Sequence, residues 1–101
     1  MPSPLASCLF TFEPSIPMEE AAATFQLALL AAESLHGADR VTLDAVFRID
    51  HDTRSIEVDR STSVGCTLAL VFLGYARCEF GQDAFRMRRV HGTGVTGEVG
   101  Q

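Results

Sequence analysis

The chain has 101 residues, of which 47% are hydrophobic and 21% charged, and its net charge at neutral pH is -5. This length accommodates one domain, and this composition is typical of a globular protein rather than a disordered one. The excess of negative charge argues against nonspecific nucleic-acid binding, because such binding needs a basic surface. All eight basic residues are arginine, so Schiff-base and P-loop chemistry, which require lysine, are excluded.

The three cysteines, Cys8, Cys66 and Cys78, form no CxxC pair and match no metal-ligand spacing. Cys66 and Cys78 fall on one predicted helix, about 18 Å apart at the rise of an α-helix, which is beyond the reach of a disulfide. We therefore expect buried free thiols in a reducing, cytoplasmic compartment. Residues 1–7 lack a basic segment followed by an apolar run, so we expect no signal peptide. Neither a metal nor another cofactor is predicted.

The first third of the chain predicts a strand followed by a helix. Apolar and polar side chains alternate over residues 7–13, which is typical of a strand with one buried face. Pro17 suits the first turn of a helix. We expect this helix to run from Pro17 to His36 and to end at Gly37, a residue that readily adopts the left-handed conformation of a helix cap.

The middle of the chain predicts a β-hairpin. Residues 41–50 alternate between an apolar face and a face that is polar except at Val46, and they are predicted to form one strand. Residues 55–60 follow as the return strand, and the polar break at residues 51–54 has the length of a hairpin loop. Within that break, Asp52 is expected to form the turn, so Asp50, His51 and Asp52 are interpreted as a solvated turn rather than a metal site.

The last third predicts a second helix and a final strand. Ser63 is expected to cap the helix, which should end near Phe80, where Gly81 stops it. Residues 85–90 again alternate and are predicted to form the fourth strand.

This order of elements, β-α-β-β-α-β, predicts an α+β two-layer sandwich of the ferredoxin-like type. Its sheet would have four antiparallel strands in the order 4-1-3-2, with both helices on one face. Another small α+β meander with the same elements paired differently is the alternative. The domain is expected to occupy residues 1–91, and the glycine-rich segment 92–101 to be a flexible tail. The fold class leaves the function open, because it hosts enzymes, metal carriers, RNA binders and sensors.

The second predicted helix is too apolar for a helix with one solvent-facing side, since Arg77 and Glu79 are its only charges. The uncharged run at residues 61–76 is shorter than the ~20 apolar residues that cross a bilayer, so we expect no membrane insertion. The excess apolar surface is either wedged between the sheet and the first helix or buried against a second copy or another protein. The residues expected at this interface are Ala69, Leu70, Leu73, Gly74 and Phe80.

The segment that leads into this helix is a candidate anion site. Hydroxyl groups, a glycine and free backbone N–H groups at a helix N-terminus suit an anion, and Arg60 offers two hydrogen bonds to a phosphate or carboxylate. No glycine-rich phosphate motif is present, however, and plain capping explains the same residues. No base is identifiable near Cys66, so a structural cysteine is the simpler interpretation. The candidate anion-binding residues are Arg60, Ser61, Thr62, Ser63, Gly65 and Cys66.

The outward face of the sheet is expected to be charged. Glu57 and Asp59 face the same way two residues apart, but a spacing alone does not make a hydrolase site. RNA recognition modules stack bases on aromatic side chains of this face, and the outward positions are not aromatic, so no nucleic acid is expected. We predict no catalytic residue. The outward charged residues are expected to be Glu13, Asp44, Arg48, Asp50, Glu57, Asp59, Arg86 and Arg88.

The sequence therefore favours a small cytoplasmic, non-catalytic interaction or regulatory module that forms a homodimer, or binds a protein partner, through its second helix. The first alternative is a small-ligand sensor that binds an anion at the Ser61–Cys66 helix start. The second is a small enzyme that uses the carboxylates of the open sheet face.

Overall fold

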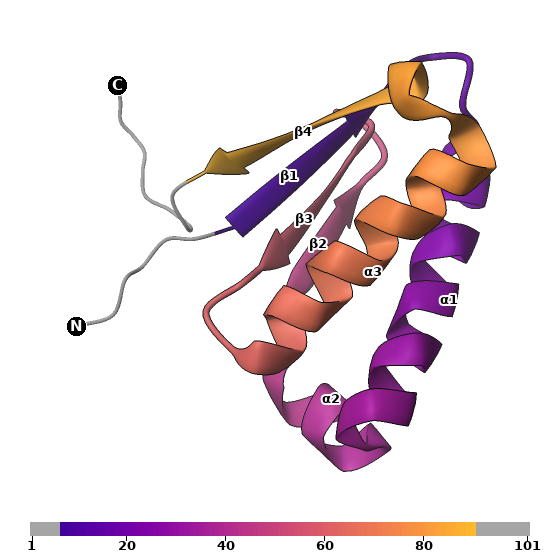
Figure 1. Cartoon of the computed structure of the whole chain (residues 1–101). Coiled ribbons are helices and arrows are strands. Elements are labelled where there is room, and N and C mark those ends of the chain that lie inside the picture. The colour runs from indigo at the N-terminus through magenta and orange to yellow at the C-terminus, as the bar shows by residue number, and fades with distance from the viewer. Residues whose placement is uncertain (1–6, 91–101) are drawn as a thin grey trace.

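A computed structural model describes residues 7–90 of the chain, and the tail predicted at residues 92–101 lies outside this range. It shows an α+β fold in which a four-stranded antiparallel sheet carries helices on one face (Figure 1). The class predicted from the sequence is confirmed at this level. The elements are β1 (Ser7–Phe12), α1 (Met18–His36), α2 (Ala38–Asp44), β2 (Phe47–Asp50), β3 (Ser55–Asp59), α3 (Ser63–Phe80), the 3-10 turn η1 (Gln82–Ala84) and β4 (Phe85–Val90).

The sheet has the order β2-β3-β1-β4, and every neighbouring pair is antiparallel. Phe10 of β1 lies opposite Ile56 of β3 and Met87 of β4, so these three side chains share the face that the helices cover. The strands β2 and β4 are therefore the two edges of the sheet, and α1 and α3 run side by side over one of its faces (Figure 1).

A cluster of aromatic rings joins the two layers. The ring of Phe72 on α3 lies 4.8 Å from that of Phe10 on β1 and 5.1 Å from that of Phe25 on α1, with interplanar angles of 79° in both pairs. All three side chains are fully buried. Such edge-to-face pairs contribute about 0.5–1.5 kcal/mol each beyond the burial of their area. The cluster thereby holds both long helices against the central strand.

The two long helices begin and end close to the residues predicted from the sequence. The helix α1 begins at Met18, one residue after Pro17, and α3 ends at Phe80. Gly37 and Gly81 follow these helices with φ angles of 92°, in the region where a side chain would be strained. The glycines therefore stop both helices, as predicted.

The segment at residues 41–50 is not the single strand that its alternation predicts. Residues Ala38–Asp44 form the short helix α2, and the strand β2 begins only at Phe47. Alternation would place Val41 and Leu43 on one face, but Val41 is buried while Leu43 is 79% exposed.

Packing against the two long helices explains this difference. Val41 packs with Ala32 of α1 and Val64 of α3 in a second, smaller cluster of buried residues. Within α2, Arg40 and Asp44 stand one helical turn apart and form an ion pair of 2.9 Å, a spacing that supports a helix. Asp44 is thus on α2 and not on the outward face of the sheet, where the sequence placed it.

The hairpin between β2 and β3 is closed by a side chain other than the predicted one. The Oδ1 atom of Asp50 accepts hydrogen bonds from the backbone N–H groups of Asp52 (2.9 Å) and Thr53 (3.2 Å). Asp50 therefore forms the turn, and Asp52 only supplies a donor to it. The position of Asp50 at the end of β2 explains this, because its side chain can reach the N–H groups two and three residues ahead.

Arg54 ties the same hairpin to the loop before α1. Its backbone has a φ of 56°, which is uncommon for a residue other than glycine. Its guanidinium donates to the carbonyl oxygen of Glu13 at 2.7 Å and to those of Phe12 and Ile16. One charged side chain thus satisfies several loop carbonyls, which accounts for the loop's fixed path between β1 and α1.

We expect the contribution of Asp50 to stability to depend on pH. The hydrogen bond from the Thr53 backbone, with those from Asp52 and the Thr53 hydroxyl, holds the pKa of Asp50 below its ordinary range. The stabilisation is therefore fully present above the pKa of an unfolded aspartate and is lost as the pH falls through the lowered folded value. The difference in melting temperature between the wild type and Asp50→Ala should shrink as the pH is lowered from 7 to roughly 2.5.

The variant Asp50→Asn supplies the control, because its side-chain oxygen still accepts hydrogen bonds but does not titrate over this range. The melting temperature of Asp50→Asn should exceed that of Asp50→Ala by an amount that does not change with pH. If the difference in melting temperature between the wild type and Asp50→Ala is also independent of pH, the turn-forming role of the ionised carboxylate is contradicted.

Candidate functional site

The two long helices expose large apolar side chains on the side that faces away from the sheet. On α1, Leu27 and Leu30 are each 57% exposed and Leu35 is 70% exposed, while on α3 Leu70 is 71% and Tyr75 38% exposed. Single exposed leucines are ordinary on protein surfaces, but several on two adjacent helices are characteristic of association sites. We call these five residues the outer helical face.

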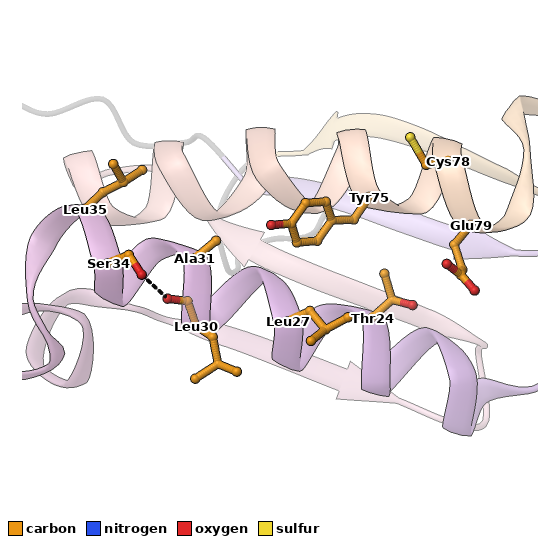
Figure 2. Close-up of a pocket in the computed structure, with 9 residues that line it drawn as sticks. All are labelled: Thr24, Leu27, Leu30, Ala31, Ser34, Leu35, Tyr75, Cys78 and Glu79. Carbon is orange, nitrogen blue, oxygen red and sulfur yellow. Dashed lines mark hydrogen bonds between the residues drawn. The ribbon is translucent and has the colours of Figure 1, made fainter.

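A groove of about 660 Å³ runs between α1 and α3 on this face (Figure 2). Leu27, Leu30 and Leu35 line it from α1, and Tyr75 extends from α3 into the space between the helices. Glu79 is its single charged lining residue among those the structure describes. The groove is therefore mainly apolar with a charge at one end, and Thr24, Ser34 and Cys78 also line it.

Leu30 also lines a second, smaller groove of about 230 Å³ on the other side of α1. Its other apolar walls are Leu29 and Ala45, together with Val41 of α2 and Phe47 of β2. Because a groove lies on each side of Leu30, this residue forms a ridge on the molecular surface. A partner that packs on the outer helical face would meet a ridge and a groove side by side.

The five residues that the sequence assigned to an interface differ in their exposure in the structure. Leu70 and Gly74 are exposed on α3, but Ala69 is buried in the core of the chain. Leu73 and Phe80 are half-buried and pack against that core. Leu70 and Gly74 alone among these five are therefore fully available to a partner.

Sequence reasoning missed the contribution of α1. The seven-residue repeat of Glu19, Gln26 and Glu33 marks one narrow polar stripe on this helix. The structure shows two apolar stripes on this helix, one buried and one exposed. The spacing of Leu27 and Leu30 was a visible signal, but a pattern alone does not say which of two apolar stripes meets the sheet.

Hydrogen bonds within the chain use some of the donors of the candidate anion site at the start of α3. Thr62, rather than the predicted Ser63, caps the helix, and its Oγ1 accepts from the Gly65 N–H at 3.0 Å. The Ser61 N–H donates to Oδ1 of Asp59 at 2.7 Å. An anion would have to compete with a carboxylate that already lies there, so this geometry does not favour anion binding.

Gly65 and Cys66 of that candidate site both lie close to the backbone at the end of β3. A Cβ atom at Gly65 would lie 2.0 Å from the carbonyl oxygen of Asp59, so the glycine is explained by the close approach of α3 to the end of β3. The Cys66 thiol donates to the carbonyl oxygen of Arg60 at 3.3 Å. Cys66 and Cys78 are exposed, whereas Cys8 is buried, which corrects the expectation that all three thiols are buried.

The carboxylates of β3 do not form an isolated pair. Glu57 lies opposite Arg48 of β2, and their side chains form an ion pair of 3.4 Å. The carboxylate of Asp59 accepts the hydrogen bond from the Ser61 N–H just before α3. Among residues 7–90, no three of the histidine, cysteine, aspartate and glutamate side chains are grouped so that they could hold a metal ion.

By length and composition alone, α3 could cross a membrane, since its 18 residues have a mean hydropathy of 1.2. The helix thus reaches the lower bound of a spanning segment, so its length does not support the expectation that it stays out of a membrane. Leu68 and Phe72 of this helix are fully buried inside the domain. About a third of the helix is buried within the described part of the chain.

Comparison with protein-family models, with curated proteins and with solved structures finds no match to this chain.

The two glycines of α3 yield a matched test of the packing. Gly65→Ala should lower the free energy of unfolding by about 1–3 kcal/mol, because the added Cβ collides with backbone that cannot yield easily. Gly74→Ala should raise it by about 1 kcal/mol, since a Cβ there meets no atom within 4 Å and alanine favours a helix. Urea unfolding in dilute solution measures both, and equal effects at the two sites would contradict the observed approach of α3 to β3.

Proposed function

We propose that the protein is a non-catalytic interaction module that associates with a second copy of itself through the outer helical face. The observation that carries this proposal is the exposure of five large apolar side chains on two adjacent helices. Complete burial of one leucine side chain is worth about 1.5–3 kcal/mol relative to full exposure. Several half-exposed leucines buried together would therefore supply a substantial part of the free energy that a stable dimer requires.

The shape of this face favours a second copy over an unrelated partner. Each molecule carries both a ridge at Leu30 and the groove between α1 and α3. In a two-fold dimer the same patch meets itself, so the ridge of one copy can enter the groove of the other. Gly74 is exposed beside Leu70 on α3, and the absence of its side chain permits a close approach of the two helices.

The charges near this face are compatible with such a dimer. Arg77 and Glu79 of α3 are both exposed and opposite in sign, and they project to different sides of the helix because they are two residues apart. In a two-fold dimer each of them can stay at the rim of the contact, in water. The apolar centre of the face would then be buried without removing an unpaired charge from water.

We further infer that the fold is of the ferredoxin-like type and that the protein resides in the cytoplasm. The sheet order β2-β3-β1-β4, with two long helices on one face, supports the first inference, and α2 is then an addition to the connection between α1 and β2. Two exposed free thiols, Cys66 and Cys78, support the second, since such thiols persist in a reducing compartment.

Charge substitution on the outer helical face should abolish the dimer without unfolding the chain. In Leu27→Arg combined with Leu70→Arg, both replaced side chains are more than half exposed, so the melting temperature in dilute solution should stay close to that of the wild type. Native mass spectrometry should show a concentration-dependent dimer for the wild type and a monomer for the double variant.

Leu43→Arg is the matched control, because Leu43 is 79% exposed on α2 and lies outside the groove between α1 and α3. This variant should dimerise like the wild type. A wild-type protein that stays monomeric at high concentration would refute the proposal, and so would a double variant that still dimerises.

A further inference from the structure

The edge strand β4 has one neighbour in the sheet, β1, and residues 7–90 supply no strand on its other side. The backbone N–H of Glu13, just beyond β1, donates to the carbonyl oxygen of Ala84, just before β4, at 2.9 Å. Hydrogen bonding alternates along an antiparallel pair. The backbone groups of Met87 and Arg89 therefore point away from β1, toward the open edge of the sheet.

This edge carries a concentration of positive charge in an otherwise acidic protein. Three of the eight arginines, Arg86, Arg88 and Arg89, lie within four consecutive positions, and all three are exposed. No carboxylate of residues 7–90 forms an ion pair with any of them. By contrast, Arg40 and Arg48 each have a carboxylate partner. The charge on β4 is thus unbalanced by the described part of the chain.

The side chains of β4 alternate between the two faces of the sheet. Arg86 and Arg88 lie opposite Thr11 and Leu9 of β1 and share the open face of the sheet. Met87 lies on the helix-covered face but is 39% exposed. An added strand along this edge would therefore lie beside four side chains in the order positive, apolar, positive, positive. These belong to residues 86–89.

We propose that β4 binds an acidic, extended segment of a partner protein, which adds to the sheet as a fifth strand. The open backbone groups of β4 would form the hydrogen-bond ladder, and side chains at alternate positions would select the sequence. The segment that fits carries carboxylates opposite Arg86, Arg88 and Arg89 and an apolar residue opposite Met87. A second copy of β4 does not fit, because arginines would then face arginines across the new pair. This surface is distinct from the outer helical face.

The test uses the full chain and a fluorescent, end-capped peptide of sequence Val-Glu-Glu-Val-Glu-Thr, which presents this pattern in the antiparallel direction. Fluorescence anisotropy should show saturable binding. Arg86→Glu combined with Arg88→Glu should weaken binding by about tenfold or more, since two favourable cross-strand charge pairs become repulsive. Arg40→Glu combined with Arg48→Glu changes the net charge equally at exposed sites away from β4 and should leave the affinity within about twofold.

Two N-methylated forms of the peptide separate strand addition from charge attraction alone. One form carries methyl groups on the amides of odd positions and the other on those of even positions. In a two-stranded contact only one of these sets faces β4, so one form should lose binding and the other should keep it. Equal binding by both forms would overturn the proposal, as would no saturable binding of the parent peptide or an unchanged affinity for Arg86→Glu/Arg88→Glu.

Discussion

The ring of Phe72 lies between Phe10 of the central strand and Phe25 of α1, and the orientation of both long helices depends on this contact. Because Phe72 and Phe25 must point into the sheet, the opposite sides of α1 and α3 must point away from it. Leu30 and Leu70 lie on those opposite sides. The same aromatic packing that closes the core therefore fixes which leucines remain at the surface.

A two-layer arrangement leaves two surfaces that this core does not cover. Residues 7–90 place no third layer over the helices, so the outer helical face is apolar and exposed in this part of the chain. The sheet ends at β4, whose outer backbone groups have no strand beside them among the described residues. The first surface is mainly apolar and suits a copy of the same chain, whereas the second is rich in arginine and suits an acidic strand. The two proposed contacts use different elements and are compatible with each other.

The sequence predicted correctly those elements whose residue pattern is compatible with only one kind of secondary structure. The alternation at β1 and the glycines after α1 and α3 allow few alternatives, and these elements occur where expected. Residues 41–50 had two solutions, because alternation suits a strand while burial of Val41 against Ala32 and Val64 requires a helical turn. The outer helical face was found only in part for a similar reason. Two apolar stripes on α1 compete for the sheet, and long-range packing, which a local pattern does not contain, decides between them.

The contact between two copies can be observed directly by NMR on a mixture of isotope-labelled and unlabelled protein. Isotope-filtered spectra detect only protons on different molecules, so they report which side chains meet across the interface. The account predicts intermolecular contacts from the methyl groups of Leu27, Leu30 and Leu70 to protons of the second copy, including the ring of Tyr75, and none from Leu43. Contacts confined to Leu43, or no intermolecular contacts in a concentrated sample, would contradict the claim that the outer helical face is where the protein associates.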